Sequence, residues 1–176
     1  MTESETLREQ ARSKHIAGET VEAISLLTQA IQQDSSNTLV AMDMVQIFID
    51  IGELEQATNL FNKLPNSDME GDTGKALQGQ LTVCNLAAKT EGKAALQVRL
   101  SNNEDDYTAH FDLAICLVSE HDYQQAVEHL FHILKREPEF KEGAAREMII
   151  ALTDILAPNE PELAQSFRRR LANLLS

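Results

Sequence analysis

Apolar side chains recur every three or four residues along most of the chain, the spacing that places them on one face of a helix. Gly18 and Gly52 each separate two such stripes. Glycine adopts the left-handed backbone that ends a helix at little cost, so each pair of stripes predicts two antiparallel helices. The stripes hold Leu7 and Ala11, then Val21, Ile24, Leu27, Ala30 and Ile31, in the first pair, and Met44, Val45, Phe48 and Ile49, then Leu54, Ala57, Leu60, Phe61 and Leu64, in the second.

A six-residue pattern recurs along the chain and predicts a structural repeat. It reads GETVEA at 18–23, GELEQA at 52–57 and HDYQQA at 121–126. Ala23 and Ala57 are 34 residues apart, and Ala57 and Ala126 are 69 apart, which is two periods plus one. A worn repeat is therefore expected between them. One helix pair cannot bury its own stripe, so we expect such pairs to stack.

This pattern resembles the tetratricopeptide repeat (TPR) family. The shared features are a turn glycine, an alanine five residues later, an apolar residue four further on (Leu27, Phe61, Leu130) and a small or apolar one three after that (Ala30, Leu64, Ile133). The departures are His121 in place of the turn glycine and the absence of a large aromatic at Leu7, Ala41 and His110. The resemblance implies an all-α, TPR-like superhelix of four to five antiparallel helix hairpins that binds proteins.

The rest of the chain is consistent with one domain over residues 1–176, with about ten helices. Residues 66–73 are polar and are expected to form a linker. A weak repeat is predicted at about 70–101, with a short helix at 93–100, followed by a clear unit at 106–137 and a helix at 142–156. Pro161 suits the first turn of a last helix, at about 160–175, that caps the array or docks to a partner.

Composition narrows the classes of function. The 28 acidic and 15 basic residues give a net charge of −13, which argues against general binding to nucleic acid or anionic lipid. The charge is uneven, because residues 135–176 carry 7 basic and 7 acidic side chains. No apolar run is long enough for a membrane span or a secretory signal. The separated Cys84 and Cys116 indicate a reducing compartment or indifference to redox conditions.

The last third resembles a narrower group, the C-terminal TPR-like domain of the bacterial YbbN-type thioredoxin-like proteins (chaperedoxin family). The resemblance rests on EHLFHILKR at 128–136, EGAARE at 142–147, ALTDIL at 151–156 and FRRRLANLL at 167–175. It implies a cytoplasmic, non-catalytic module that holds unfolding client proteins and docks to the chaperonin or other chaperones. The resemblance does not cover a thioredoxin domain, so the chain is either a fragment of a longer protein, which we expect, or a stand-alone relative. A structural scaffold without affinity for unfolded chains is the alternative.

The sharpest polar feature is the run Arg168, Arg169 and Arg170. Three consecutive helical positions cannot all face one way, so at least one is expected to cover neighbouring helices. The others are either a solvated face or a docking surface for an acidic partner. Phe167, Leu171 and Leu174 are either the packed side of this helix or the contact face of a helix that detaches.

The groove of a TPR array is the second candidate. Some TPR proteins bind a partner's C-terminal carboxylate with basic side chains on their first helices. Here Asp43 and Asp112 occupy that face, so a carboxylate would be repelled and basic or apolar segments would be favoured.

Catalytic and metal sites are not expected. His129 and His132 are three residues apart on one helix but have no second cluster with ligand spacing. Cys84 and Cys116 fall among apolar positions and lack an activating cation nearby in sequence. No phosphate-binding, zinc-protease or nucleophile-elbow motif occurs, so neither an enzyme nor a cofactor is predicted.

Overall fold

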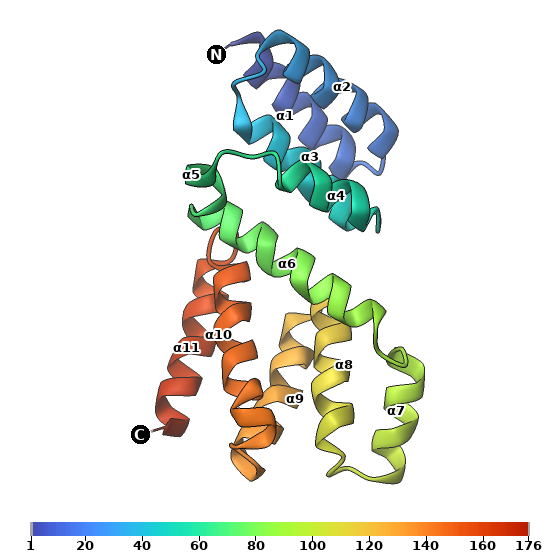
Figure 1. Cartoon of the computed structure of the whole chain (residues 1–176), viewed down its shortest axis with the longest axis vertical. Helices are drawn as coiled ribbons and strands as arrows, with labels where there is room; N and C mark the ends of the chain where they lie inside the picture. Colours follow the sequence, from blue (N-terminus) through green and yellow to red (C-terminus); the bar gives the residue numbers. More distant parts are fainter. Residues whose placement is uncertain (1, 176) are drawn as a thin grey trace. The chain divides into compact units, whose positions relative to one another are not determined.

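The computed structural model describes residues 2–175, and this part of the chain contains helices and no strands. The predicted all-α, TPR-like class is confirmed. None of these helices is both long enough and apolar enough to cross a membrane. In order they are α1 (Glu3–Ile16), α2 (Thr20–Gln33), α3 (Thr38–Asp50), α4 (Leu54–Phe61), α5 (Asn66–Met69), α6 (Asp72–Ala88), α7 (Lys93–Asn102), α8 (Tyr107–Ser119), α9 (Tyr123–Arg136), the 3-10 turn η1 (Phe140–Glu142), α10 (Ala144–Leu156) and α11 (Pro161–Leu175) (Figure 1).

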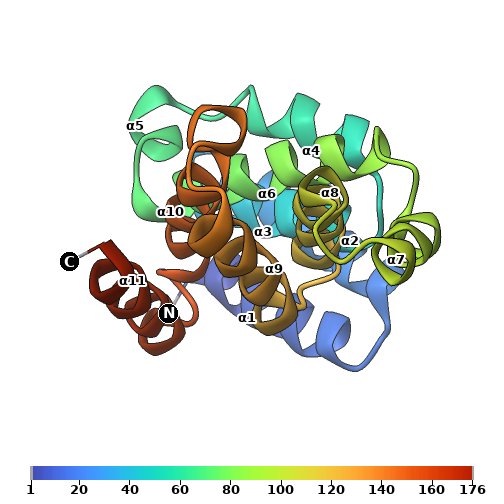
Figure 2. The same cartoon turned by 90° about the horizontal axis from the view of Figure 1, so that it is seen from below.

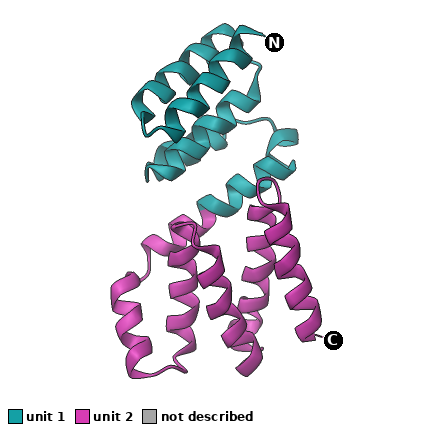
Figure 3. Cartoon of the chain, turned by 180° about the vertical axis from the view of Figure 1, so that it is seen from behind, with its two compact units in different colours: residues 1–81 teal, residues 82–176 magenta. Residues whose placement is uncertain are grey.

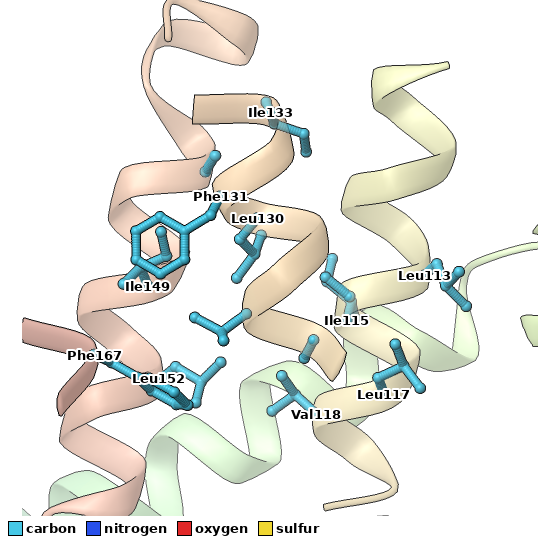
Figure 4. Packing of buried hydrophobic residues seen from close by; sticks show 14 of the residues in the cluster. Leu113, Ile115, Leu117, Val118, Leu130, Phe131, Ile133, Ile149, Leu152 and Phe167 are labelled. Carbon is cyan, nitrogen blue, oxygen red and sulfur yellow. The ribbon is translucent and has the colours of Figure 1, made fainter. Parts of the chain in front are cut away.

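The chain divides into two compact units, residues 1–81 and 82–176, and the boundary lies inside α6 (Figure 3). In unit 1, a core cluster from α1, α2 and α3 includes Ala11, Leu27 and Val40. In unit 2, a larger cluster joins α8, α9, α10 and α11, and Figure 4 shows Leu130, Ile149 and other members packed between these helices. Each unit therefore buries its own apolar stripes.

The same start is shared by five helices, α2, α4, α7, α9 and α11. In each, the residue at the fourth helical position is fully buried, and its N–H bonds to the carbonyl of the residue that precedes the helix. A small side chain there allows the paired helix to approach closely. The five residues are Ala23, Ala57, Leu96, Ala126 and Ala164. The predicted worn repeat covers α6 and α7, and Leu96 of α7 stands where the other four helices have alanine. That these two helices form a repeat stays a prediction.

The turns inside the hairpins explain one departure from the repeat pattern. Gly18 and Gly52 have φ of 84° and 82°, and His121 has φ of 64°. His121 therefore adopts the same left-handed backbone as the glycines it replaces. Histidine is among the non-glycine residues that tolerate this region.

Two sequence-based boundaries are wrong. The expected linker at 66–73 contains α5 and the start of α6, since α5 is a single turn that follows Pro65 and is too short and polar to show a stripe. The helix expected from residue 142 begins at Ala144, because Lys141, Glu142 and Gly143 have φ of 46°, 61° and 85°. A right-handed helix cannot pass through three left-handed residues.

Gly74 explains how α6 can start so soon after α5. A Cβ atom at this position would lie 2.1 Å from the carbonyl oxygen of Asp68 and 2.5 Å from that of Met69. These are backbone atoms that cannot rotate away. The turn between α5 and α6 therefore requires glycine for close approach of the chain to itself.

Candidate functional site

The last helix packs against unit 2 through its apolar side. Phe167 and Leu171 are buried in the core cluster, and Leu174 is half-buried beside it. Both Figure 1 and Figure 2 show α11 alongside α10. Of the two alternatives for these residues, the structure shows the packed one. A contact role for them requires α11 to detach and stays a prediction.

The three arginines of α11 differ in their surroundings. Arg170 forms a two-pronged ion pair with Glu128 on α9 (Nη1 to Oε1 2.7 Å, Nη2 to Oε2 3.3 Å), and its guanidinium lies 4.3 Å from the ring centroid of Phe131. Hydrogen bonds from Arg170 lower the pKa of Glu128. Arg170 is therefore the arginine that covers a neighbouring helix, and it fastens α11 to α9.

Arg168 and Arg169 are exposed on α11. Arg168 lies 4.0 Å from Asp154, the outer limit of an ion pair, and both side chains are more than half exposed. Arg169 makes no ion pair or hydrogen bond with the residues that the structure describes. Both cations are exposed to solvent, and their contact with an acidic partner stays a prediction.

Asp43 is already engaged inside unit 1. Its carboxylate accepts hydrogen bonds from Arg8 at 2.5 Å and 3.2 Å, and Nε of Arg12 lies 3.7 Å away. Arg8 and Asp43 are only 20% and 19% exposed. Asp43 therefore joins α1 to α3, and its charge is balanced by two arginines rather than presented to a partner.

Asp112 occupies the matching position in unit 2. It is the sixth residue of α8, as Asp43 is of α3, and 69 residues separate the two, the same interval that separates Ala57 from Ala126. Asp112 is half-buried and, among the described residues, has no ion pair or hydrogen bond. Of the two predicted acidic contacts, Asp112 is the one whose charge is not balanced internally.

The sequence analysis missed a polar ladder on the first helices of unit 1. His15 and Asp50 are 3.0 Å apart, and the amides of Gln46 and Gln80 exchange hydrogen bonds of 2.9 Å and 3.0 Å. The partners in each pair are 35 and 34 residues apart, one repeat period. Complementary polar side chains at that separation were the signal that could have revealed the ladder.

Two family models with the description "Tetratricopeptide repeat" match the chain, one over residues 15–81 and one over residues 86–175. The second covers just over half of the sequence. The chain belongs to the tetratricopeptide repeat family. No curated protein matches it. TPR domains are generally non-catalytic interaction modules, so this chain is a protein–protein interaction module.

The other candidate residues have internal partners in the TPR structure. In the described residues, no group of three histidine, cysteine or acidic side chains is arranged to hold a metal ion. His129 instead contacts His110, with 2.8 Å between their Nδ1 atoms. Cys116 is buried with its Sγ atom 3.2 Å from Oγ1 of Thr90. A buried thiol of this kind acts as a small apolar side chain.

Proposed function

We propose that this TPR module binds unfolding client proteins and docks to a chaperone machine in the cytoplasm, as the TPR half of a chaperedoxin-like, YbbN-type protein. The observation that carries the proposal is that α11 has one packed side and one exposed, positively charged side. Its apolar side and Arg170 hold it to unit 2, while Arg168 and Arg169 are exposed. The resemblance of the sequence at 128–175 to that family supports the same assignment. In this proposal residues 1–176 act as one domain, and α11 is its docking helix.

The docking surface in this proposal is the outer side of α11. Arg168 and Arg169 give it two positive charges on a chain whose net charge is −13. Leu175, at the end of the same helix, is 52% exposed and adds an apolar contact. Two cations beside an apolar residue suit an acidic surface with an apolar centre.

The client site in this proposal includes Asp112. Its unbalanced charge favours lysine and arginine in a client segment over acidic residues. Ile150 on α10 is 39% exposed and adds an apolar side chain on the next first helix. Unfolding proteins expose such basic and apolar segments together.

A binding assay with purified bacterial chaperonin tests docking. The double variant Arg168→Ala/Arg169→Ala should weaken the affinity of the full chain at least tenfold, because both exposed cations are lost. The matched control is Lys135→Ala/Arg146→Ala, which removes the same charge from exposed positions on α9 and α10. If both variants and the wild type bind the chaperonin with equal affinity, α11 is not the docking surface.

The alternative is a structural scaffold that assembles one specific complex. A scaffold captures a folded partner and does not suppress aggregation. The client-holding proposal predicts suppression of the aggregation of a heat-denaturing protein such as citrate synthase at near-stoichiometric ratios. An unchanged aggregation curve at fivefold excess of this chain would favour the scaffold.

A further inference from the structure

Three histidines of unit 2 lie together between α8 and α9. The ring centroid of His110 is 5.1 Å from that of His129 and 4.1 Å from that of His132. His110 is 7% exposed, and the ring of Tyr107 lies 6.3 Å from that of His132. Three titratable rings in contact, one of them buried, form a cluster that the interaction function described above does not use.

The partners of the rings determine where each neutral ring carries its proton. Nε2 of His110 lies 2.7 Å from the carbonyl oxygen of Glu104, which can only accept, so this nitrogen carries a hydrogen. The other nitrogen of His110 must then accept, and Nδ1–H of His129 donates to it across 2.8 Å. Arg136 can only donate, so Nδ1 of His132 accepts its hydrogen bond of 3.0 Å.

The neutral His132 ring therefore carries its hydrogen on Nε2. That nitrogen is buried and has no hydrogen-bond partner among the described residues. The nearest carboxylate oxygen, Oδ1 of Asp105, is 3.7 Å away. His132 is held by one hydrogen bond from Arg136 and by the stacking of its ring on His110.

This arrangement can take up one proton with its hydrogen bonds intact. The proton adds to Nε2 of His129, which leaves Nδ1–H of that ring bonded to His110. A second proton on this pair would put a hydrogen on both Nδ1 atoms, and the two N–H groups would then face each other across the 2.8 Å contact. A proton on Nδ1 of His132 would oppose the N–H of Arg136 in the same way.

The charged groups around the cluster do not allow the folded rings to take up more than this one proton. Asp106 is engaged by Arg99 and Glu128 by Arg170, and Asp105 is shared between His132 and Arg136. Burial, and then the neighbouring rings, lower the pKa of His129 and of His132. The charged or titratable groups around the cluster are Arg99 on α7, Glu104, Asp105 and Asp106 before α8, Tyr107 on α8, Glu128, Lys135 and Arg136 on α9, Lys141 in η1 and Arg170 on α11.

We propose that His110, His129 and His132 form a proton-operated latch that ties α8, α9 and the loop before α8 together at neutral pH and opens below about pH 6. In the unfolded chain all three rings take up protons near pH 6.5, whereas the closed latch takes up one. The unfolded state therefore binds more protons, so the stability of unit 2 falls as the pH falls. Opening frees the loop at Glu104 and the contact between α8 and α9.

Tyrosine fluorescence during urea unfolding tests the latch in the full chain. The chain has no tryptophan, and its two tyrosines, Tyr107 and Tyr123, both lie in unit 2. The unfolded state takes up two more protons than the closed latch, so lowering the pH from 6.5 to 5.5 should raise the equilibrium constant for unfolding about 30-fold. The double variant His129→Asn/His132→Asn, whose amides can occupy the Nδ1 positions, removes two of the three rings and should reduce this response severalfold.

His15→Asn is the control, because this histidine pairs with Asp50 in unit 1 and should leave the 30-fold response of unit 2 unchanged. The same pH dependence in the double variant and the wild type would overturn the latch. If the double variant does not fold, nitrogen-15 NMR spectra of the wild-type histidine rings test the latch instead, because they show which ring nitrogens carry hydrogen. The latch requires Nε2–H on His110 and His132 and Nδ1–H on His129 at pH 7.5. It is refuted by two charged rings of this cluster in the folded protein at pH 6.

Discussion

Asp43 and Asp112 hold the same position in their repeats and have different surroundings. In unit 1, Arg8 and Arg12 of the preceding first helix neutralise Asp43, and the pairs His15–Asp50 and Gln46–Gln80 continue this polar ladder at the same repeat interval. In unit 2, Asp112 has no such partner among the described residues. A repeat position therefore fixes where a side chain lies, and its neighbours one period away decide whether it stabilises the array or remains open to a partner.

The largest expected effect is at the position where the repeats differ most. Leu96→Ala introduces the alanine that α2, α4, α9 and α11 carry at their fourth position, but Leu96 is fully buried in the core of unit 2. Removing it should lower the free energy of unfolding by about 3 kcal/mol, because a cavity remains. Tyrosine-monitored urea unfolding measures this, with Val98→Ala on the exposed side of α7 as a control of near-zero effect. A loss below about 1 kcal/mol would mean that α7 packs as the other second helices do.

The next effect concerns the close turn in unit 1. Gly74→Ala should destabilise this unit by about 2 kcal/mol, because the new Cβ would overlap backbone oxygens of α5. Gly71→Ala is the matched control, since its Cβ would meet the nearest atom at an ordinary 3.5 Å. Urea unfolding followed by helical circular dichroism compares the two. Equal stability of these variants would show that α5 shifts to make room.

A smaller effect on stability is expected at the first turns of α8 and α3, which hold equivalent positions in their repeats. Asp106 accepts a hydrogen bond from the N–H of Ala109 and caps α8, whereas Asn37 at the start of α3 makes no side-chain cap. Asp106→Ala should cost about 1 kcal/mol at pH 7. Asn37→Ala should cost less, because it loses only a hydrogen bond of Nδ2 to Ser4. Thermal unfolding measures both, and a larger loss at Asn37 would contradict the comparison.

The acid dependence of Asp106 has a defined sign. The bond from the Ala109 N–H, together with Arg99, lowers the pKa of its carboxyl group. The folded state then binds fewer protons than the unfolded state, so the stabilisation is present above the unfolded pKa and is lost as pH falls through the folded one. The difference between wild type and Asp106→Ala should shrink below about pH 4. A constant difference down to pH 2 would exclude the charge as its cause.

Much of the fold could be predicted because helix periodicity and turn glycines are local signals. The hairpins at 18 and 52 follow from them, whereas the left-handed backbone of His121 does not, because no glycine marks that turn. Helical geometry also required one of three consecutive arginines to cover a neighbour, and that residue is Arg170. By contrast α5 is a single polar turn with no stripe to detect.

The candidate sites were less predictable because they depend on partners distant in the sequence. Asp43 and Asp112 look alike in their own helices. What distinguishes them is the pair Arg8 and Arg12, which lie 35 and 31 residues before Asp43. His129 and His132 were recognised as neighbours on one helix. Their contact with His110 required the packing of α8 against α9.

The most direct measurement compares Asp43→Asn with Asp112→Asn in the full chain, with unfolding and suppression of citrate synthase aggregation recorded for each. The account predicts that Asp43→Asn lowers stability by about 1 kcal/mol and leaves suppression unchanged, since its ion pair is internal. It predicts that Asp112→Asn keeps stability and weakens suppression severalfold. Weakened suppression in Asp43→Asn with no effect of Asp112→Asn would contradict the claim that partners contact the acid that the repeat leaves unpaired.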